Sequence, residues 1–255
     1  MAASRAGEHW CFVAAPKAWP ALPREVSVST LSEIESCPRR WALNSAEYPE
    51  LWGRRGYPPR LSVPSLTGSV IHLTLQTITK ALARAGCDSL QHEDAVQVMR
   101  SLGGYTKVIN NCIERILQRF ASNPRASPMM EIAVRTLQSR IPEMRAQVQT
   151  LLGRIKLQKS SPLGVLPDQG GRPRTPLGPG TYPELELRVP RIGWHGVADL
   201  LLLSNNSCSI VDFKTGEPDD SHRFQLRVYA LLWSRDVDLN PAGRKVDRLT
   251  LSYRD

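Results

Sequence analysis

The chain has 255 residues, with 33 lysines and arginines against 24 aspartates and glutamates, and a formal net charge of +9. A chain of this length can bury one substantial core together with a helical insert. The basic charge favours a protein that meets a polyanion such as a nucleic acid, through release of counterions. Residues 1–21 contain charged side chains and prolines but no long apolar run, so the sequence predicts neither a signal peptide nor a membrane span.

The five cysteines are scattered along the chain without close spacing. An odd number of cysteines without close pairs is typical of reduced thiols rather than of a disulfide framework. The sequence therefore predicts a cytoplasmic protein.

The middle of the chain is predicted to be helical and then flexible. Apolar residues recur there at steps of three and four, and Pro142 should kink or restart the last helix. The interspersed arginines and lysines fit the solvated face of amphipathic helices better than the lining of a DNA channel. Almost half of the residues from 160 to 183 are proline or glycine, which predicts a flexible connector. We expect an N-terminal extension over residues 1–26, N-terminal helices of the main domain over 27–86, an α-helical insert over 87–159, a Pro/Gly-rich flexible loop over 160–183, and a catalytic core over 184–255.

Two apolar runs near the C-terminus predict a β-hairpin whose ends carry charged side chains. Residues 196–203 and 209–216 flank a turn-rich Ser-Asn-Asn-Ser tetrad. Asp199 then begins one strand, and Asp212 and Lys214 close the other. Because strand side chains alternate, Asp212 and Lys214 should share one face. Two carboxylates and an ammonium group therefore converge at a strand end, which we expect to be solvated.

This group of charges suits metal-assisted chemistry on a phosphate. Carboxylates and a backbone carbonyl are the ligands that Mg²⁺ or Mn²⁺ prefers, and such an ion can polarise a phosphate and lower the pKa of a bound water. A neighbouring lysine can orient that water and offset the growing negative charge. The alternative is a surface Asp–Lys pair contributing roughly 0–1 kcal/mol. The Asp-Phe-Lys tripeptide alone does not distinguish the two interpretations.

Four further elements accompany the hairpin in a fixed order. They are residues 29–41 with the sequence Cys-Pro-Arg-Arg-Trp, the Gly-x-x-x-His run that ends at His72, the acids Glu184 and Glu186, and the Gln-x-x-x-Tyr run from Gln225 to Tyr229. The ordered set resembles the PD-(D/E)XK nuclease superfamily, and within it the RecB-like branch of helicase-associated and CRISPR-adaptation nucleases. The resemblance covers roughly residues 27–86 and 182–254.

The resemblance implies an α/β fold: a restriction-endonuclease-like core with a central mixed sheet flanked by helices, interrupted by the α-helical insert. It implies a metal-dependent deoxyribonuclease that hydrolyses phosphodiester bonds. The implied action is exonuclease-like, in DNA repair, recombination or phage defence. The expected cofactor is Mg²⁺ or Mn²⁺, and the expected partner is DNA. The sequence has no Gly-rich phosphate-cradling loop, so a motor would come from a separate helicase or defence-complex subunit.

The resemblance also assigns roles to particular residues. The expected metal ligands are His72, Asp199, Asp212 and the carbonyl of Phe213. Lys214 would position the attacking water, and Gln225 and Tyr229, which share a helix face, would steady the lysine and the phosphate. An imidazole ligand would favour Mn²⁺ over Mg²⁺. Replacing Asp199, Asp212 or Lys214 by alanine should abolish cleavage and leave the fold largely intact.

The choice of the assisting acid is open between two residues. Glu184 and Glu186 have the same strand parity, so both should face one side of the sheet. Glu186 lies deeper in the apolar alternation of its strand and is preferred, with Glu184 as the alternative.

Many members of the RecB-like branch hold a four-cysteine iron–sulfur cluster. Cys37 matches the first ligand, but no cysteine follows Cys208. No iron–sulfur cluster is therefore expected from this chain. Either Cys37 packs as a small apolar residue in a cluster-free protein, or the natural chain continues beyond Asp255.

The main alternative function is a non-catalytic, nuclease-like DNA-binding scaffold within a helicase–nuclease or defence complex. The intact acids and lysine favour the enzyme, since a scaffold has no need of them.

Overall fold

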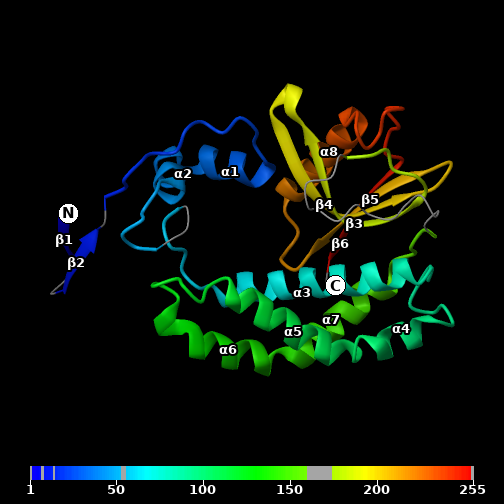
Figure 1. The fold of residues 1–255 in the computed structure, drawn as a ribbon, viewed down its shortest axis with the longest axis horizontal. Coiled ribbons are helices and arrows are strands. Elements are labelled where there is room, and N and C mark those ends of the chain that lie inside the picture. Colours follow the sequence, from blue (N-terminus) through cyan, green and yellow to red (C-terminus); the bar gives the residue numbers. More distant parts are fainter. Residues whose placement is uncertain (1, 7–8, 14, 53–55, 160–173, 254–255) are drawn as a thin grey trace.

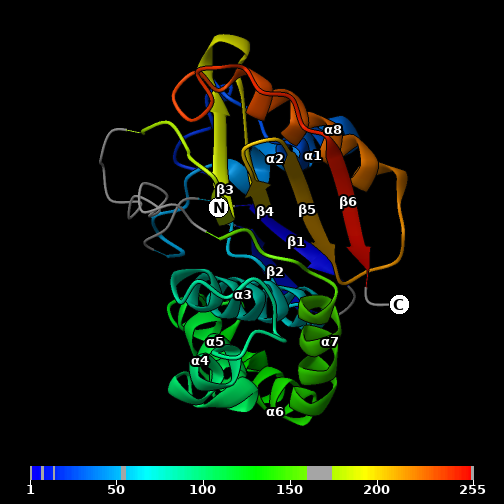
Figure 2. The same cartoon turned by 90° about the vertical axis from the view of Figure 1, so that its right-hand side faces the viewer.

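A four-stranded mixed sheet lies between helices on both of its faces (Figure 1). The computed structural model describes residues 2–6, 9–13, 15–52, 56–159 and 174–253. Helix α8 (Asp220–Arg235) covers one face of the sheet, and α3 (Val63–Arg84) lies against the other, as Figure 2 shows. This arrangement confirms the predicted α/β class with a central mixed sheet.

The sheet has the order β3-β4-β5-β6. Its strands are β3 (Gly180–Val189), β4 (Trp194–Leu203), β5 (Cys208–Lys214) and β6 (Arg248–Tyr253). The first three strands are antiparallel neighbours and β6 runs parallel to β5, so the predicted hairpin of β4 and β5 is confirmed. The short helix η2 (Pro190–Ile192) joins β3 to β4. Strand β3 begins at Gly180, earlier than expected, while residues 160–173 of the predicted loop lie outside the described residues.

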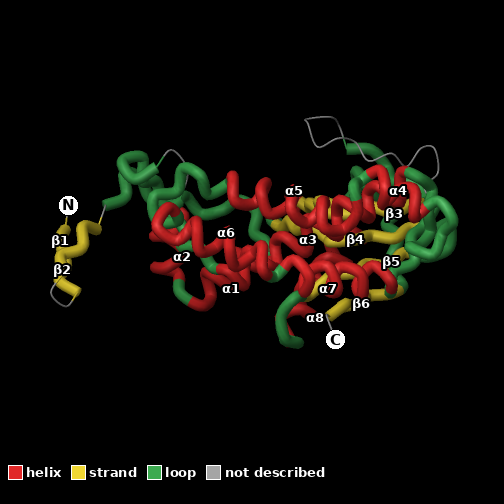
Figure 3. Tube along the Cα trace, turned by 90° about the horizontal axis from the view of Figure 1, so that it is seen from below, coloured by secondary structure: helices red, strands yellow, loops and turns green. Residues whose placement is uncertain are grey.

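The insert forms a helical layer on the side of α3 that faces away from the sheet (Figures 2 and 3). Its elements are α4 (Ala95–Ser101), α5 (Gly104–Gln118), η1 (Ser127–Met129), α6 (Met130–Ser139) and α7 (Ile141–Gly153). Pro142 lies in the first turn of α7, where its missing N–H removes no helical hydrogen bond, so the predicted restart is confirmed. Among the described helices, none is long and apolar enough to cross a bilayer.

The N-terminal part consists of a small two-stranded sheet and two short helices. Strands β1 (Ala2–Ala6) and β2 (His9–Val13) pair with each other, and α1 (Val28–Ser36) precedes α2 (Pro38–Ser45). The expected single opening helix is thus divided at Cys37, whose backbone is extended with φ −167°. The Cys37 Sγ atom accepts a hydrogen bond from the N–H of Arg40 at 3.4 Å. This half-buried thiol therefore caps α2 instead of packing in a core.

Two apolar cores hold the sheet in place. One lies between the sheet and the helical layer and includes Val70 and Phe213, and the other lies under α8 and includes Leu187 and Trp233. The sheet side chains thus divide by face, as strand alternation requires. A strand end enclosed by both layers can keep its polar groups away from bulk water.

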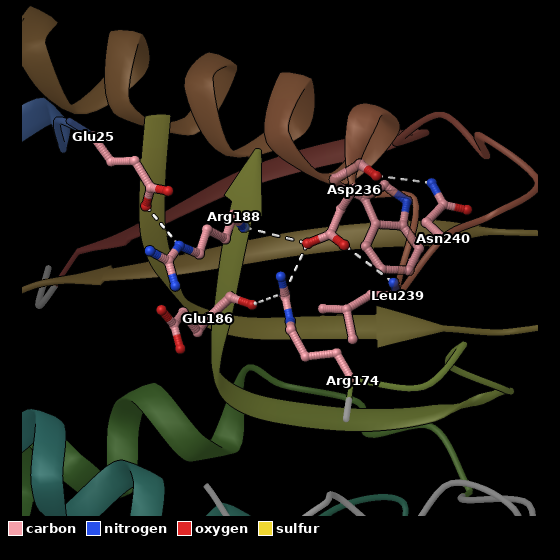
Figure 4. Close-up of polar contacts among 8 residues, drawn as sticks. Glu25, Arg174, Glu186, Arg188, Asp236, Leu239 and Asn240 are labelled. Carbon is pink, nitrogen blue, oxygen red and sulfur yellow. Dashed lines mark hydrogen bonds and ion pairs between the residues drawn. The ribbon is translucent and has the colours of Figure 1, made fainter. Parts of the chain in front are cut away.

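A buried carboxylate joins the end of α8 to β3 (Figure 4). The side chain of Asp236 is 0% exposed, and its Oδ2 atom lies 2.7 Å from Arg174 Nη2. The same carboxylate accepts hydrogen bonds from the backbone N–H groups of Arg188 at 3.2 Å and Leu239 at 3.1 Å. Asp236, which directly follows α8, therefore contacts Arg174, which precedes β3, and Arg188 near the end of β3.

We expect Asp236→Ala to lower the free energy of unfolding by about 3–5 kcal/mol, because it leaves Arg174 without its counter-ion and two backbone N–H donors without their acceptor. Urea denaturation followed by circular dichroism measures the change. The control is Glu25→Ala, which breaks the partly exposed Arg188–Glu25 ion pair and should change stability by less than about 1 kcal/mol. Similar losses in the two variants would contradict the role given to Asp236.

Candidate metal centre and active site

The site lies where strands β4 and β5 separate. Their antiparallel ladder runs from Leu203↔Cys208 to Leu200↔Val211. Asp199 and Asp212 follow directly after the last of these pairs. The fork between the strands therefore presents both predicted acids, but on a part of the sheet that helices cover on either side.

Three side chains from three elements meet at this fork. His72 of α3, Glu184 of β3 and Asp199 of β4 each offer one ligand atom, and these atoms all lie within 4.8 Å of one another. The His72 Nδ1 atom is 3.3 Å from Asp199 Oδ1. Asp199 Oδ2 accepts a hydrogen bond from the N–H of Phe213 at 2.7 Å, which holds this carboxylate towards β5. Asp199 therefore has one oxygen fixed by the backbone and one directed to the histidine.

Glu184 reaches the fork through an unusual backbone conformation. The register of β3 and β4 places it opposite Asp199, between the pairs Pro183↔Leu200 and Leu185↔Ala198. Its φ is +53°, in the left-handed region that non-glycine residues rarely adopt. Strained backbone of this kind is concentrated at functional sites, because the surrounding structure must hold it in place. The strain is consistent with a site that requires this carboxylate.

The structure places the preferred acid, Glu186, outside this cluster, and its assisting role stays a prediction. This residue pairs with Val197, two positions further along the ladder towards the β3–β4 turn, and its side chain is exposed. It lines a separate pocket of about 620 Å³ together with Arg24, Arg188 and His195. Figure 4 shows its carbonyl oxygen accepting a hydrogen bond from Arg174, at 2.7 Å. Glu186 lies two residues further along β3 than Glu184, and it is therefore farther from the acids at the fork between β4 and β5.

Two glycines allow the helices to approach the sheet closely. A Cβ atom on Gly68 would lie 3.0 Å from Thr215 Oγ1, so the glycine lets α3 bring His72 close to the end of β5. A Cβ atom on Gly196 would lie 2.6 Å from Tyr229 Cε1, which would push α8 away from β4. Both glycines belong to the motifs seen in the sequence, but their packing role requires the tertiary structure.

A second group of side chains forms a continuous chain of contacts beside the first. Lys214 Nζ lies 2.6 Å from Asp212 Oδ2 and donates a hydrogen bond to Gln225 Oε1 at 2.6 Å. Gln225 Nε2 donates in turn to the Tyr229 hydroxyl at 2.6 Å. The ammonium group of Lys214 is therefore held between β5 and α8. Asp212 itself lies outside the three-residue cluster, and its role as a ligand stays a prediction, as does that of the Phe213 carbonyl.

This strand end is buried, contrary to the expectation of a solvated one. Asp212 is 2% exposed, and the side chain of Lys214 is 16% exposed. Helix α8 packs over the end of the strand and excludes water. A substitution that removes one partner of the Asp212–Lys214 pair therefore leaves the other as a buried, uncompensated charge.

The clustered acidic groups of the site favour the binding of a cation. Burial, followed by the charge of Asp199, raises the pKa of Glu184 to about 7, although His72 and Lys80 oppose the shift. Burial and Asp199 also raise the pKa of Asp212 to about 6, against the effect of Lys214. Burial by itself lowers the pKa of His72, but the hydrogen bond and charge of Asp199 outweigh it, so that this pKa is raised. Glu184 and Asp212 thus resist ionisation next to the charge of Asp199.

The donors fit a divalent metal ion. Two carboxylates and an imidazole are suitable ligands for Mg²⁺ or Mn²⁺, with the imidazole better suited to Mn²⁺. The buried Oδ2 atom of Asp212 also has no hydrogen-bond partner among the described residues, despite its ion pair with Lys214. His72, Glu184 and Asp199 are accordingly the residues that would hold the ion.

The raised pKa of Glu184 predicts how metal-free stability changes with pH. The pKa of its carboxyl group is about 7 in the folded protein but near 4.5 when the chain is unfolded. The folded state therefore binds more protons between these values, and stability falls as pH rises through this window. With EDTA present, we expect the Tm of the wild type to decrease from pH 5 to pH 7.5. Glu184→Gln should show a smaller decrease; an equal decrease would argue against the shift.

The fold and the site together define an α/β protein with an acidic cluster that could hold a metal ion, beside a largely buried lysine. The family model described as the PD-(D/E)XK nuclease superfamily matches residues 25–254, and the chain belongs to this superfamily. Its members are in general nucleases that act on DNA with divalent metal ions. Neither a search of curated proteins nor a search of solved structures found a match.

Proposed function

We propose that this chain is a metal-dependent deoxyribonuclease of the RecB-like branch. The observation that carries the proposal is the cluster of His72, Glu184 and Asp199 next to the Asp212–Lys214 pair. Assignment to the branch rests on the Cys-Pro-Arg-Arg-Trp run at the start of α2 and on the contact of the Gln-x-x-x-Tyr motif with the lysine. An imidazole ligand favours Mn²⁺ over Mg²⁺.

When bound, a divalent ion would supply polarisation of the phosphate and a lower pKa for a coordinated water. The contribution of this chain is to place donors and charges around that chemistry. Lys214 presents a fixed positive charge that can hold the attacking water and stabilise the negative charge that develops on the phosphate. Because Asp212 and Gln225 already hold the ammonium group, little reorganisation is needed during the reaction.

Gln225 and Tyr229 act as positioning residues in this proposal. The Gln225 Nε2 atom donates a hydrogen bond to the Tyr229 hydroxyl. This bond orients the Gln225 amide so that its Oε1 atom faces Lys214. Burial, and then the charge of Asp212, raises the pKa of Tyr229, so its hydroxyl stays neutral at physiological pH. A neutral hydroxyl can accept from Gln225 and donate elsewhere.

The biological setting that we propose is exonuclease-like degradation in DNA repair, recombination or phage defence, in the cytoplasm. The four cysteines whose side chains the structure describes, Cys37, Cys87, Cys112 and Cys208, are free thiols, which agrees with a reducing compartment. The sequence has no phosphate-cradling loop of the helicase type, so a separate helicase or defence-complex subunit would supply any motor.

The test is degradation of end-labelled linear DNA and of circular DNA by the purified chain with Mg²⁺, Mn²⁺ or EDTA. The proposal expects metal-dependent loss of linear DNA, with circular DNA left intact if the action is exonucleolytic. Cleavage of the circle would show endonuclease action. Metal-independent or absent cleavage, with salt-sensitive DNA binding retained, would favour the non-catalytic scaffold.

A further inference from the structure

A basic groove lies between the segment that follows α7 and the sheet, and its lining includes none of the three residues of the candidate metal cluster. The groove has a volume of about 570 Å³ and lies between residues 154–158 and strands β5 and β6. Three cations line it: Arg154, Lys156 and Arg248. Among the described residues that line the groove, none is an aspartate or a glutamate. The positive charge of the groove is therefore not neutralised by its own lining.

The segment that forms one wall of the groove is firmly anchored. Ile155 and Leu157 are buried in the core under the sheet, at 7% and 6% exposure. Leu157 also donates a backbone hydrogen bond to Asp88 at 2.6 Å. The residues that alternate with them, Arg154 and Lys156, are exposed. This alternation fixes the backbone while it directs the two cations outward.

Two of the three cations are free to bind a ligand. Arg154 donates a hydrogen bond to the carbonyl oxygen of Tyr253 at 2.9 Å and so joins the segment to β6. The side chains of Lys156 and Arg248, in contrast, form no hydrogen bond or ion pair with any residue in the described ranges. Exposed cations without an internal partner remain available for an external anion.

The position of the groove relates it to the active site. Tyr253 lines the groove and pairs with Lys214 across the β5–β6 ladder. Neighbouring strands lie about 5 Å apart, so one end of the groove is next to the strand that carries the lysine. The floor of the groove contains the apolar side chains Leu202 and Val211. The cations can contact the phosphates of a nucleic acid strand, and the apolar floor can contact its sugars or bases.

We propose that this groove binds the backbone of a single nucleic acid strand, with Lys156 and Arg248 contacting phosphates. The inference rests on the proposed nuclease function and adds a binding surface to it. A volume of about 570 Å³ falls within the range of ligand pockets, roughly 300–1,000 Å³, and suits an unpaired strand rather than a duplex. In a single strand the bases are also free to meet the apolar floor of Leu202 and Val211.

The test is the salt dependence of DNA binding by the full chain in EDTA, where metal-dependent cleavage does not occur. Affinity for a labelled oligothymidine and for a duplex of equal length is measured between 50 and 200 mM salt. Each phosphate contact contributes about 0.7 to the slope of log affinity against log salt for a single strand, and about 0.9 for a duplex. The double variant K156Q/R248Q should therefore reduce the single-strand slope by about 1.4, with the duplex slope unchanged.

The matched control is K107Q/R119Q, which removes the same charge from α5 and its C-cap, on the far side of α3 from the sheet (Figure 2). It should leave the single-strand slope unchanged. Equal slopes for the two double variants would overturn the proposal, and a decrease confined to the duplex would overturn the choice of a single strand. Circular dichroism and Tm verify that K156Q/R248Q folds, as expected for exposed side chains without partners.

This experiment distinguishes failure of the groove assignment from failure of the nuclease proposal. If the wild type does not cleave DNA but K156Q/R248Q loses the expected slope, the groove assignment stands and the nuclease proposal fails. If the wild type cleaves DNA and the slopes are equal, only the groove assignment fails.

Discussion

Lys214→Ala is expected to lower kcat for DNA cleavage by at least about 10²–10³-fold, the loss that follows removal of one fixed donor to a developing charge. Lys214 is held by Asp212 and Gln225, each at 2.6 Å, so no neighbouring group can easily replace it. Single-turnover cleavage of end-labelled DNA with saturating Mn²⁺ measures the effect. Activity within tenfold of the wild type would remove Lys214 from the mechanism.

This variant requires a control for folding, because it leaves the buried Asp212 carboxylate without its cation. Removing one partner of a buried ion pair typically costs about 3–5 kcal/mol. Lys214→Arg keeps a positive charge beside Asp212 but cannot place a compact ammonium group at the same point. We expect Lys214→Arg to be more stable than Lys214→Ala and still impaired in kcat. Assays below the Tm of both variants then separate lost chemistry from lost structure.

Glu184→Gln should weaken Mn²⁺ binding about 10–100-fold and reduce cleavage, whereas Glu186→Gln should leave both unchanged. Both changes replace one carboxyl group by an amide on the same strand, so they are matched controls for each other. Only Glu184 joins His72 and Asp199 within 4.8 Å. The expected range is that of a substitution that disturbs a metal site. Isothermal titration with Mn²⁺ measures the affinity without any dependence on activity.

A stronger effect of Glu186→Gln would return the assisting role to the residue preferred from sequence. Equal, small effects of both changes would show that neither carboxylate contributes to metal binding. Because Glu184 has a positive φ, the Tm of Glu184→Gln should also be recorded with and without Mn²⁺. Stabilisation by Mn²⁺ in the wild type, lost in this variant, would link the metal to the residue.

Local patterns predicted several elements correctly. The Ser-Asn-Asn-Ser tetrad between two apolar runs predicted the β4–β5 hairpin, since a turn this short joins antiparallel strands. Strand alternation predicted that Asp212 and Lys214 share a face, and their atoms lie 2.6 Å apart. Helical periodicity placed Gln225 and Tyr229 on one face of α8, where they form a hydrogen bond. Each of these predictions depends on residues that are close in sequence.

Other features could not be predicted in this way. The alternation of strand side chains could not distinguish Glu184 from Glu186, because residues two apart lie on the same side of a strand. The choice follows from the β3–β4 register and from the backbone of Glu184, which involve residues far apart in sequence. The buried state of Asp212 likewise depends on α8, which packs over the strand end. The division of the opening helix at Cys37, in contrast, has a local cause, because Pro38 disfavours a helical backbone in the residue before it.

The sequence by itself determined the residue types of the site, the order of the motifs and the strands and helices that carry them, because alternation and helical periodicity act over a few residues. The tertiary structure decided which acid joins His72 and Asp199, how deeply Lys214 is buried, and where three cations form a groove without carboxylates. These properties depend on the distances between separate elements, which the close packing at Gly68 and Gly196 sets.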